Sequence, residues 1–296
     1  MIRQSFRRLL PAKIVRPLER WRDRIRLSRA ERAVAAFRQP GVRIHGLPGE
    51  LIVSLTSYPP RYGMLAKTLK GLLAQTIRPD RTILWIAEGD MATLPDEVCD
   101  LKSCGLEVRT CHDLRSYNKI IHTLKLWPDA FIVTADDDLY YEPKWLETLV
   151  QGVRAGENII VCRRALRPTR VGGSYAAFTE WQQDIITDGE PADTLFPTGV
   201  GGVLYPPHCL APEVMDEQVF LALCPHDDDS WLYFMSRRAG SKYSQVGGGF
   251  AQVMWPGSQA TSLMSINLIG GENDRQLSAV IEHYASPAPA RERKLT

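Results

Sequence analysis

Two runs of aspartate hold the residues of this sequence that are best suited to chemistry, Asp136–Asp138 and Asp227–Asp229. Three consecutive carboxylates are unfavourable inside a core, because they repel one another and lose their hydration. A helix N-cap accounts for one aspartate of the first run, and a solvated turn is the other structural interpretation. A hard cation accounts for more of them, since Mg²⁺ or Mn²⁺ binds one or two carboxylates together with phosphate oxygens. We therefore favour a metal site at the first run.

The position of the first run indicates which of its side chains meet. The run follows the apolar segment 131–135, which predicts a buried strand. Alternate side chains of an extended chain point to opposite faces, so we expect Asp136 and Asp138 to point into one crevice while Asp137 points elsewhere. The second run precedes a predicted helix over 228–239, and one of its aspartates is expected to cap that helix.

The elements that must position these side chains alternate along the chain. Apolar runs predict strands at 51–55, 82–86, 131–135 and 159–162, with helices between them. The segment 107–110 is interpreted as a short strand, the third in chain order. This order calls for an α/β fold, with a mostly parallel sheet flanked by helices on both faces. Ligands of such sheets bind beyond the carboxyl ends of the strands. The loops after the first four strands are therefore expected around one crevice.

The pattern is weaker after residue 165. Residues 166–198 are rich in loop-forming residues and predict a substrate-facing insertion or lid. Residues 199–204 are small and apolar, the stretch 242–246 predicts an extended segment, and 273–283 predicts a last helix with an apolar inner face.

Length and composition limit the class of protein. The chain has 296 residues, of which 44% are hydrophobic and 24% charged, as is usual for a soluble globular protein. No stretch approaches the ~18 apolar residues of a membrane-spanning helix, and the N-terminus lacks the apolar region of a secretory signal. The six cysteines have no CxxC spacing, so they predict small buried side chains in a reducing cytosol and neither a disulfide scaffold nor a zinc site.

The net charge of +2 conceals a basic N-terminal arm. Residues 1–43 carry thirteen Lys and Arg against three acidic residues, a net charge of +10, which leaves −8 on the rest of the chain. Phe6, Leu10, Trp21 and Ile25 are available for an apolar face. A basic helix with such a face is typical of attachment to an anionic membrane surface. A solvated helix packed on the body and a nucleic-acid-binding arm are the alternatives.

These features divide the chain into three parts. We expect a basic amphipathic helical arm over 1–43 with an interruption near Pro17, one catalytic domain over 44–284, and a flexible tail over 285–296. The predicted localisation is cytoplasmic, peripherally associated with the inner face of the cell membrane, and no nucleic acid is expected as a partner.

The segment Ile132–Tyr141, followed by Pro143, Trp145 and Leu146, resembles the DxD segment of GT-A glycosyltransferases. It is most similar to that of bacterial family-2-like enzymes of capsule, lipopolysaccharide and exopolysaccharide synthesis. Further segments that match in the expected order are Val53–Arg61, Tyr117–Lys119, Gly199–Pro207, His226–Trp231 and Gly271–Asp274. Together they cover roughly residues 50–284, and the arm lies outside the resemblance.

The resemblance implies a metal-dependent enzyme that moves a sugar from a nucleotide-diphosphate donor to a saccharide or lipid-linked acceptor. It implies that Asp138 is a direct ligand of Mn²⁺ or Mg²⁺ and that Asp136 contacts the metal sphere or the ribose. It also implies an inverting transfer in which Asp229, or as second choice Asp228, deprotonates the acceptor hydroxyl. The further nucleotide-sugar contacts that it implies are Thr56, Tyr58, Arg61, Lys119, Asp137, Gly201 and Gly202.

Structural interpretations of these residues stand beside the functional ones. Arg61 lies in a Pro-rich turn and Lys119 opens a predicted helix, so either side chain is alternatively just solvated. The glycines of the run 199–202 permit close approach of a sugar, and the run is no phosphate loop because no GK[ST] follows it.

Two other classes of function remain open on the sequence. A phosphatase or phosphotransferase of the DxDxT type would use Asp136 as its nucleophile, but it would place Thr or Val where Tyr140 stands. Its motif would also normally follow the first strand of the sheet. A non-catalytic membrane or nucleic-acid adaptor carried by the arm is the third class, and it leaves both aspartate runs unexplained.

Overall fold

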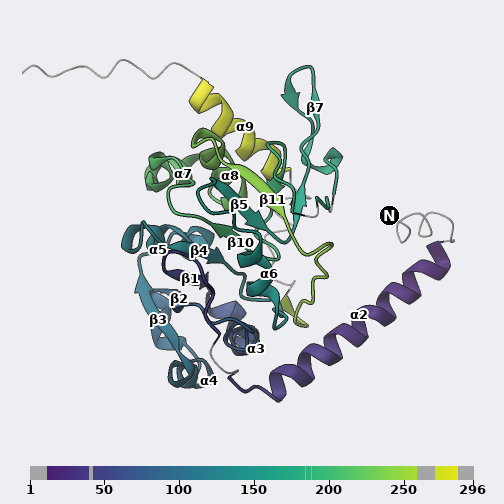
Figure 1. Ribbon diagram of the computed structural model, residues 1–296, viewed down its shortest axis with the longest axis vertical. Helices are drawn as coiled ribbons and strands as arrows, with labels where there is room; N and C mark the ends of the chain where they lie inside the picture. Colours follow the sequence, from purple (N-terminus) through teal and green to yellow (C-terminus); the bar gives the residue numbers. More distant parts are fainter. Residues whose placement is uncertain (1–11, 40–42, 184, 188, 259–270, 286–296) are drawn as a thin grey trace, which may run out of the picture.

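A computed structural model describes residues 12–39, 43–183, 185–187, 189–258 and 271–285 (Figure 1). Seven strands form one sheet in the order β11-β5-β10-β4-β1-β2-β3. The strands are β1 (Leu51–Thr56), β2 (Arg81–Ala87), β3 (Leu106–Cys111), β4 (Phe131–Thr134), β5 (Ile159–Cys162), β10 (Val203–Tyr205) and β11 (Lys242–Gln245). β10 is antiparallel to both of its neighbours, and the other pairs in this sheet are parallel.

The predicted α/β fold with a mostly parallel sheet is confirmed. The five predicted strands correspond to β1–β5 within one or two residues. The antiparallel β10 was not predicted, and it separates β5 from β4. It closes the middle of the sheet, because all three of its residues pair with β4 on one side and two of them pair with β5 on the other.

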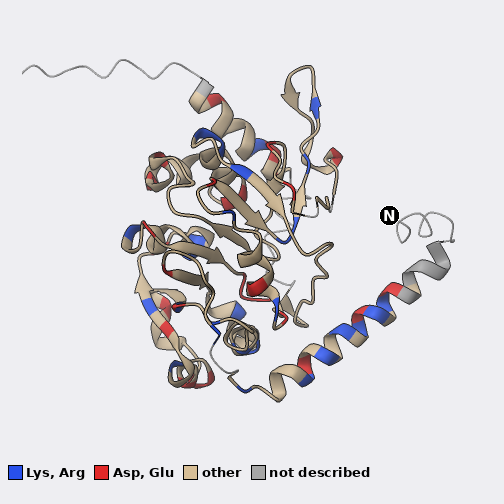
Figure 2. Ribbon diagram, in the orientation of Figure 1, with Lys and Arg blue, Asp and Glu red and all other residues tan. Residues whose placement is uncertain are grey.

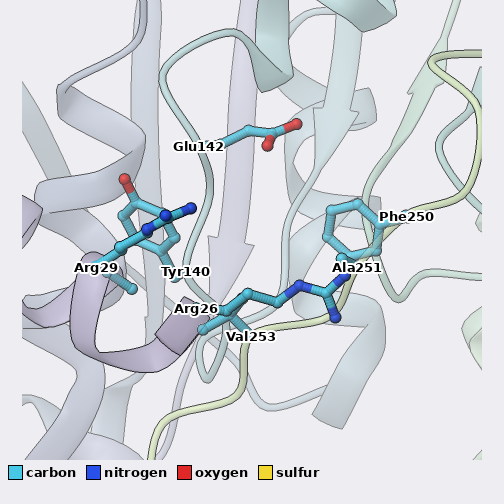
Figure 3. Close-up of a pocket in the computed structure, with 8 residues that line it drawn as sticks. Arg26, Arg29, Tyr140, Glu142, Phe250, Ala251 and Val253 are labelled. Atoms are coloured by element: carbon cyan, nitrogen blue, oxygen red, sulfur yellow. The ribbon is translucent and has the colours of Figure 1, made fainter. Parts of the chain in front are cut away.

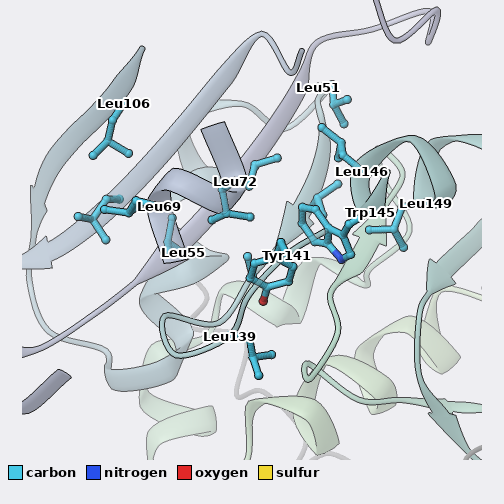
Figure 4. Packing of buried hydrophobic residues seen from close by; sticks show 14 of the residues in the cluster. Leu51, Leu55, Leu69, Leu72, Leu106, Leu139, Tyr141, Trp145, Leu146 and Leu149 are labelled. Carbon is cyan, nitrogen blue, oxygen red and sulfur yellow. The ribbon is translucent and has the colours of Figure 1, made fainter. Parts of the chain in front are cut away.

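Helices cover both faces of the sheet. They are α3 (Tyr62–Leu73), α4 (Asp96–Asp100), α5 (Ile121–Leu126), α6 (Trp145–Gln151), α7 (Glu217–Leu223), α8 (Asp228–Arg238) and α9 (Glu272–Ala285). Alternate residues of β1 divide between the faces. Leu51, Val53 and Leu55 join one core with leucines of α3 and with α6 (Figure 4), whereas Ile52 packs on the opposite side. Each fully buried aliphatic side chain contributes about 1.5–3 kcal/mol to this packing.

A second core forms on the other half of the sheet. Trp231 of α8, Phe220 of α7 and Leu277 of α9 pack there against β5, β10 and β11. Phe196 and Trp181, from the stretch predicted to be an insertion or lid, are buried in the same core. That stretch therefore belongs in part to the core. Its short strands are β6 (Ala165–Leu166), β7 (Arg170–Val171), β8 (Ser174–Tyr175) and β9 (Phe196–Pro197).

The basic arm is represented by one long helix, α2 (Ala12–Ala35), which projects beyond the body of the molecule (Figure 1). The expected interruption is absent from the described part, because α2 continues through Pro17. Its C-terminal half is tied to the body, where Ala30 and Val34 pack against Trp255. Trp21 remains 60% exposed.

Basic side chains are spaced along α2, with acidic ones among them (Figure 2). Phe6 and Leu10, with the rest of residues 1–11, and the tail from residue 286 lie outside the described residues. No helix in the described ranges is long and apolar enough to span a membrane. Attachment of the arm to a membrane surface stays a prediction.

Gly202 provides a test of how the sheet is packed at β10. Its φ is +91°, and a Cβ added there would lie 2.5 Å from the indole of Trp145. We predict that Gly202→Ala destabilises the fold by about 2–5 kcal/mol, because left-handed backbone strain adds to overpacking. Chemical denaturation measures this loss.

Gly63→Ala is the matched control. Gly63 lies in α3, and nothing lies within 4 Å of the position that its Cβ would take. Alanine there should be neutral or stabilise the fold by up to about 1 kcal/mol. Equal stability of the two variants would contradict the packing described for Gly202.

Candidate active site

Strand direction brings the two aspartate runs to one edge of the sheet. In the β1–β4 ladder Ser54 pairs with Thr134, so the segments that follow the two parallel strands leave the sheet side by side. β10 runs the other way, and its first residue, Val203, also pairs with Thr134. The glycine run 199–202, which precedes β10, therefore reaches the same edge. This is the edge at which ligands of parallel α/β sheets bind.

Arg61 holds the first run from the side of β1. It ends the short helix η1 (Pro59–Arg61) and is buried. Its Nη1 forms an ion pair with Asp138 and lies 3.8 Å from Asp137 Oδ1. Asp137 also accepts a hydrogen bond of 2.6 Å from Ser57 Oγ. The expected alternation of side chains therefore fails here, because the chain leaves the extended strand after Thr134.

Lys119 joins the two runs. It closes the short helix η4 (Arg115–Lys119), and its side chain is about one-tenth exposed. Its Nζ lies 3.5 Å from Asp136 Oδ1 and 2.9 Å from Asp228 Oδ2. η4 is anchored beside the second run, because the hydroxyl of Tyr117 donates a hydrogen bond of 2.7 Å to the carbonyl of Cys224.

Asp229 lies against the glycine run. The backbone N–H of Gly199 lies 3.0 and 2.9 Å from the two carboxylate oxygens of Asp229. A Cβ at position 199 would lie 3.0 Å from Asp229 Oδ1 and 3.2 Å from Lys119 Nζ. Glycine is therefore the residue that lets this N–H reach the carboxylate. Sequence reasoning noted the run but did not select Gly199.

Asp227 has a structural role in the second run. It is the N-cap of α8, where its carboxylate accepts hydrogen bonds from the N–H and the hydroxyl of Ser230. The expectation that one aspartate of this run caps the helix is confirmed. Asp228 and Asp229 lie in the first turn of α8, and capping does not account for them.

Residues that were not predicted as site residues hold the backbone of the first run through hydrogen bonds. The N–H of Asp136 donates to the hydroxyl of Tyr141 at 2.7 Å, and the hydroxyl of Thr68 donates to the carbonyl of Asp137 at 2.9 Å. The N–H of Trp255 donates to the carbonyl of Asp138 at 3.1 Å. Two of these contacts come from distant segments, so no local sequence signal marks them.

Burial shifts the protonation equilibria of the site. It raises the pKa of Asp136, and it raises the pKa of Asp137 and of Asp227 to about 6. Burial, and next the charge of Asp228, raises the pKa of Asp229 well above its ordinary value. Carboxylates behave in this way where cations do not fully compensate them.

The pKa values of the two cations, Lys119 and Arg61, are also raised. Burial by itself lowers the pKa of Lys119, but the charges of Asp228, Asp136 and Asp229 raise it above its ordinary value. The carboxylates around Arg61 likewise outweigh the effect of burial and raise its pKa. Both side chains therefore stay charged at neutral pH.

The remaining predicted residues are close to this edge but make other contacts. Thr56 Oγ1 donates to the carbonyl of Trp85 on β2. Tyr58 lies just after β1 and is 40% exposed. Gly201 and Gly202 have φ of +98° and +91°, and they lie against Phe250 and Trp145 respectively. Packing inside the protein is sufficient reason for these two glycines, and their contact with a sugar stays a prediction.

The two aspartate runs offer oxygen ligands of the kind that a divalent cation prefers. Within the described ranges, no group of three or more His, Cys, Asp or Glu side chains is arranged to hold a metal ion. Asp136 and Asp138 each lie beside a cation. A Mg²⁺ or Mn²⁺ ion that arrives with a diphosphate needs only one or two protein carboxylates, however. The oxygen donors and the incompletely compensated negative charge fit such an ion.

No protein-family model matches the chain, and no curated protein matches its sequence. Solved structures show limited similarity. Glucosyl-3-phosphoglycerate synthase from Mycobacterium tuberculosis, in complex with Mn²⁺, UDP and glucosyl-3-phosphoglycerate, aligns with a TM-score of 0.44 at 13% identity, over 84% of this chain and 87% of that one. In another complex of that enzyme the aligned part is 43% of this chain and 48%, about half, of the other, with a TM-score of 0.32 at 17% identity.

A third similar structure is 4-diphosphocytidyl-2C-methyl-D-erythritol synthase from Anaerococcus prevotii. It aligns with a TM-score of 0.39 at 12% identity, over 77% of this chain and 96% of that one. At these identities and TM-scores the chain is assigned to no family. What the structure itself establishes is an α/β protein with a mostly parallel seven-stranded sheet and with charged side chains gathered at the edge where ligands of such sheets bind.

Asp227→Asn tests the buried charge of the second run. The folded protein holds the Asp227 proton more tightly than the unfolded chain, so the contribution of Asp227 to stability falls as the pH rises from 3.8 through about 6. Asparagine keeps a capping oxygen and does not titrate. Relative to the wild type, the variant should gain about 1.4 kcal/mol for each unit of raised pKa between pH 4 and pH 7, measured by denaturation.

Asp216→Asn is the control for this experiment. Asp216 caps α7 in the same way, by accepting from the N–H of Val219, but it is exposed. Its substitution measures what an amide in place of a capping carboxylate does to stability at an exposed site. If Asp227→Asn gains no more stability between pH 4 and pH 7 than Asp216→Asn does, then Asp227 is not a buried carboxyl with a raised pKa.

Proposed function

We propose that this chain is a metal-dependent glycosyltransferase, which moves a sugar from a nucleotide-diphosphate donor to a saccharide or lipid-linked acceptor. One observation carries the proposal: Lys119 bridges two aspartate runs at the ligand-binding edge of the sheet. Sugar transfer needs both kinds of group, charged side chains for a diphosphate and a separate carboxylate for the acceptor hydroxyl.

The proposed donor site lies on the β1 side of this edge. Arg61 and Lys119 are buried, charged and already close to carboxylates, so phosphate oxygens arriving there meet fixed cations. Tyr58, which is exposed beside Arg61, is suited to stacking on the base. Asp138, together with Asp136, would hold Mn²⁺ or Mg²⁺ as the resemblance implies. A bound divalent cation would neutralise negative charge on the departing diphosphate.

Asp229 is the proposed base for the acceptor hydroxyl. A general base works best when its pKa lies near the working pH, and burial raises the pKa of Asp229 in that direction. Asp228 is the weaker choice because Lys119 lies only 2.9 Å from its carboxylate. The N–H of Gly199 fixes the Asp229 carboxylate without a second cation.

Asp138→Asn tests the proposed metal site. A screen of nucleotide sugars, read as Mn²⁺-dependent release of the nucleoside diphosphate, should find a donor for the wild-type protein. The variant should lose this activity and bind the nucleotide more weakly, because a neutral amide is a poorer ligand for a hard cation. Far-UV circular dichroism should show an unchanged fold.

Asp129→Asn is the matched control, since Asp129 is an exposed aspartate at the opposite end of β4. It should keep the activity of the wild type. Full Mn²⁺-dependent activity in Asp138→Asn would rule out the metal site. Hydrolysis of phosphomonoesters with no turnover of any nucleotide sugar would favour the phosphatase alternative instead.

Asp229→Asn tests the proposed base. Loss of a general base lowers kcat by about 10²–10⁴-fold. Binding of the donor, measured by titration calorimetry, should change much less than kcat, because Asp229 forms no ion pair with Arg61 or Lys119 among the described residues and acts on Lys119 through its charge. Asp228→Asn should lower kcat less. If both variants transfer sugar at the wild-type rate, the second run is purely structural.

A further inference from the structure

A cavity of about 220 Å³ lies between α2 and the body of the protein (Figure 3). Arg26 and Arg29 of α2 line one side of it. Tyr140 and Glu142, which follow the first aspartate run, and Phe250 line the others. The space would hold several water molecules, each of which takes about 30 Å³ in the liquid. It is therefore large enough for a small polar group attached to a larger molecule.

The charges on the lining favour an anion. In Figure 3 the guanidinium groups of Arg26 and Arg29 extend from α2 into the space beside Tyr140 and Phe250. Arg29 forms no ion pair with any residue that the structure describes. Arg26 is 3.1 Å from Asp23, its neighbour on the exposed surface of α2, and pairs of this kind are weak. Glu142 is the carboxylate in the lining.

A third arginine stands behind two of the lining residues. Arg163 is 5% exposed, and its Nε and Nη1 have no hydrogen-bond partner in the described structure. Its Nη2 lies 3.2 Å from Glu142 Oε1, and its guanidinium lies 5.5 Å from the ring centre of Phe250. Arg163 thus engages the one acidic side chain of the cavity wall. Because Arg163 is paired with Glu142, the positive charges of Arg26 and Arg29 are left without a carboxylate in the lining.

Two residues that line the cavity also adjoin the proposed active site. Tyr140 is two residues beyond Asp138, and its N–H donates to the carbonyl of Val253. Phe250 packs on Gly201, where an added Cβ would lie 2.9 Å from its ring. An anion in the cavity would therefore lie one aromatic ring away from the glycine turn. Asp229 contacts Gly199, two residues earlier in the same turn.

We infer that the cavity between α2 and the body binds a phosphate group of the acceptor, with Arg26 and Arg29 as its ligands and Arg163 restraining Glu142. This inference rests on the proposed function, which supplies the acceptor. Arginine suits the task, because its planar fork of donors matches phosphate oxygens. The N-terminal helix would then be part of the substrate site.

Binding of inorganic phosphate to the full-length protein tests the inference. Isothermal titration at pH 7, with chloride adjusted to constant ionic strength, should give a saturable signal for the wild type. Arg26→Gln/Arg29→Gln should weaken phosphate binding by about tenfold or more, since each lost charge-assisted hydrogen bond is worth about one such factor. The single variant Arg29→Gln should show part of this loss.

Arg22→Gln/Arg24→Gln is the matched control. These two arginines are exposed on the same helix and do not line the cavity, so the variant removes the same charge from α2. It should bind phosphate within about twofold of the wild type, because general electrostatic attraction to an exposed helix is weak. Equal phosphate affinity in the two double variants, or no saturable binding by the wild type, would overturn the inference.

Nucleotide-sugar turnover, assayed on the same samples, separates this inference from the proposed function. If the chain turns over no nucleotide sugar while the two double variants still differ in phosphate affinity, the cavity binds phosphate and the proposed function fails. If turnover is present and the double variants bind phosphate alike, the proposed function stands and the inference about the cavity is wrong.

Discussion

Negative charge at one edge of the sheet is the constraint on which the arrangement of this protein depends. Carboxylates of two distant segments converge there, and Arg61 and Lys119 are the side chains that make the convergence tolerable. Each cation is buried with its partners, so its hydration is replaced by ion pairs. The short helices that carry them, η1 and η4, follow β1 and β3 directly. The order of the strands therefore brings the carboxylates and the cations that compensate them to the same edge of the sheet.

The sequence was sufficient for the framework and for the aspartates. Short apolar segments predicted β1, β2, β4 and β5, whose residues are mostly buried on both faces. β3 is only partly buried, and its place in the alternating order of strands and helices predicted it. The same patterns did not predict the direction of β10. A three-residue strand has no periodicity of its own, and its partners in β4 and β5 lie far away along the chain.

The sequence indicated which residues belong to the candidate site more readily than which of them contact one another. Arg61 and Asp138 are 77 residues apart, so no local spacing announces their ion pair. The alternation rule misplaced Asp137, because it holds for extended chain and the strand had already ended. Gly202 was predicted to line a sugar pocket, and the structure shows that it also lies against Trp145, which no local pattern indicated. A glycine in a sequence can indicate that another group packs closely against the backbone, but only the folded structure shows which group this is.

The contacts of Trp255 give the N-terminal helix a mechanical connection to the aspartates. Val34 of α2 packs on the Trp255 ring, whose Nε1 donates to the hydroxyl of Thr68, and that hydroxyl donates to the carbonyl of Asp137. The backbone N–H of the same tryptophan holds Asp138. One packed ring and a short series of hydrogen bonds thus form a linkage between α2 and the carboxylates. The position of α2 and the backbone of the first aspartate run are therefore both held by Trp255.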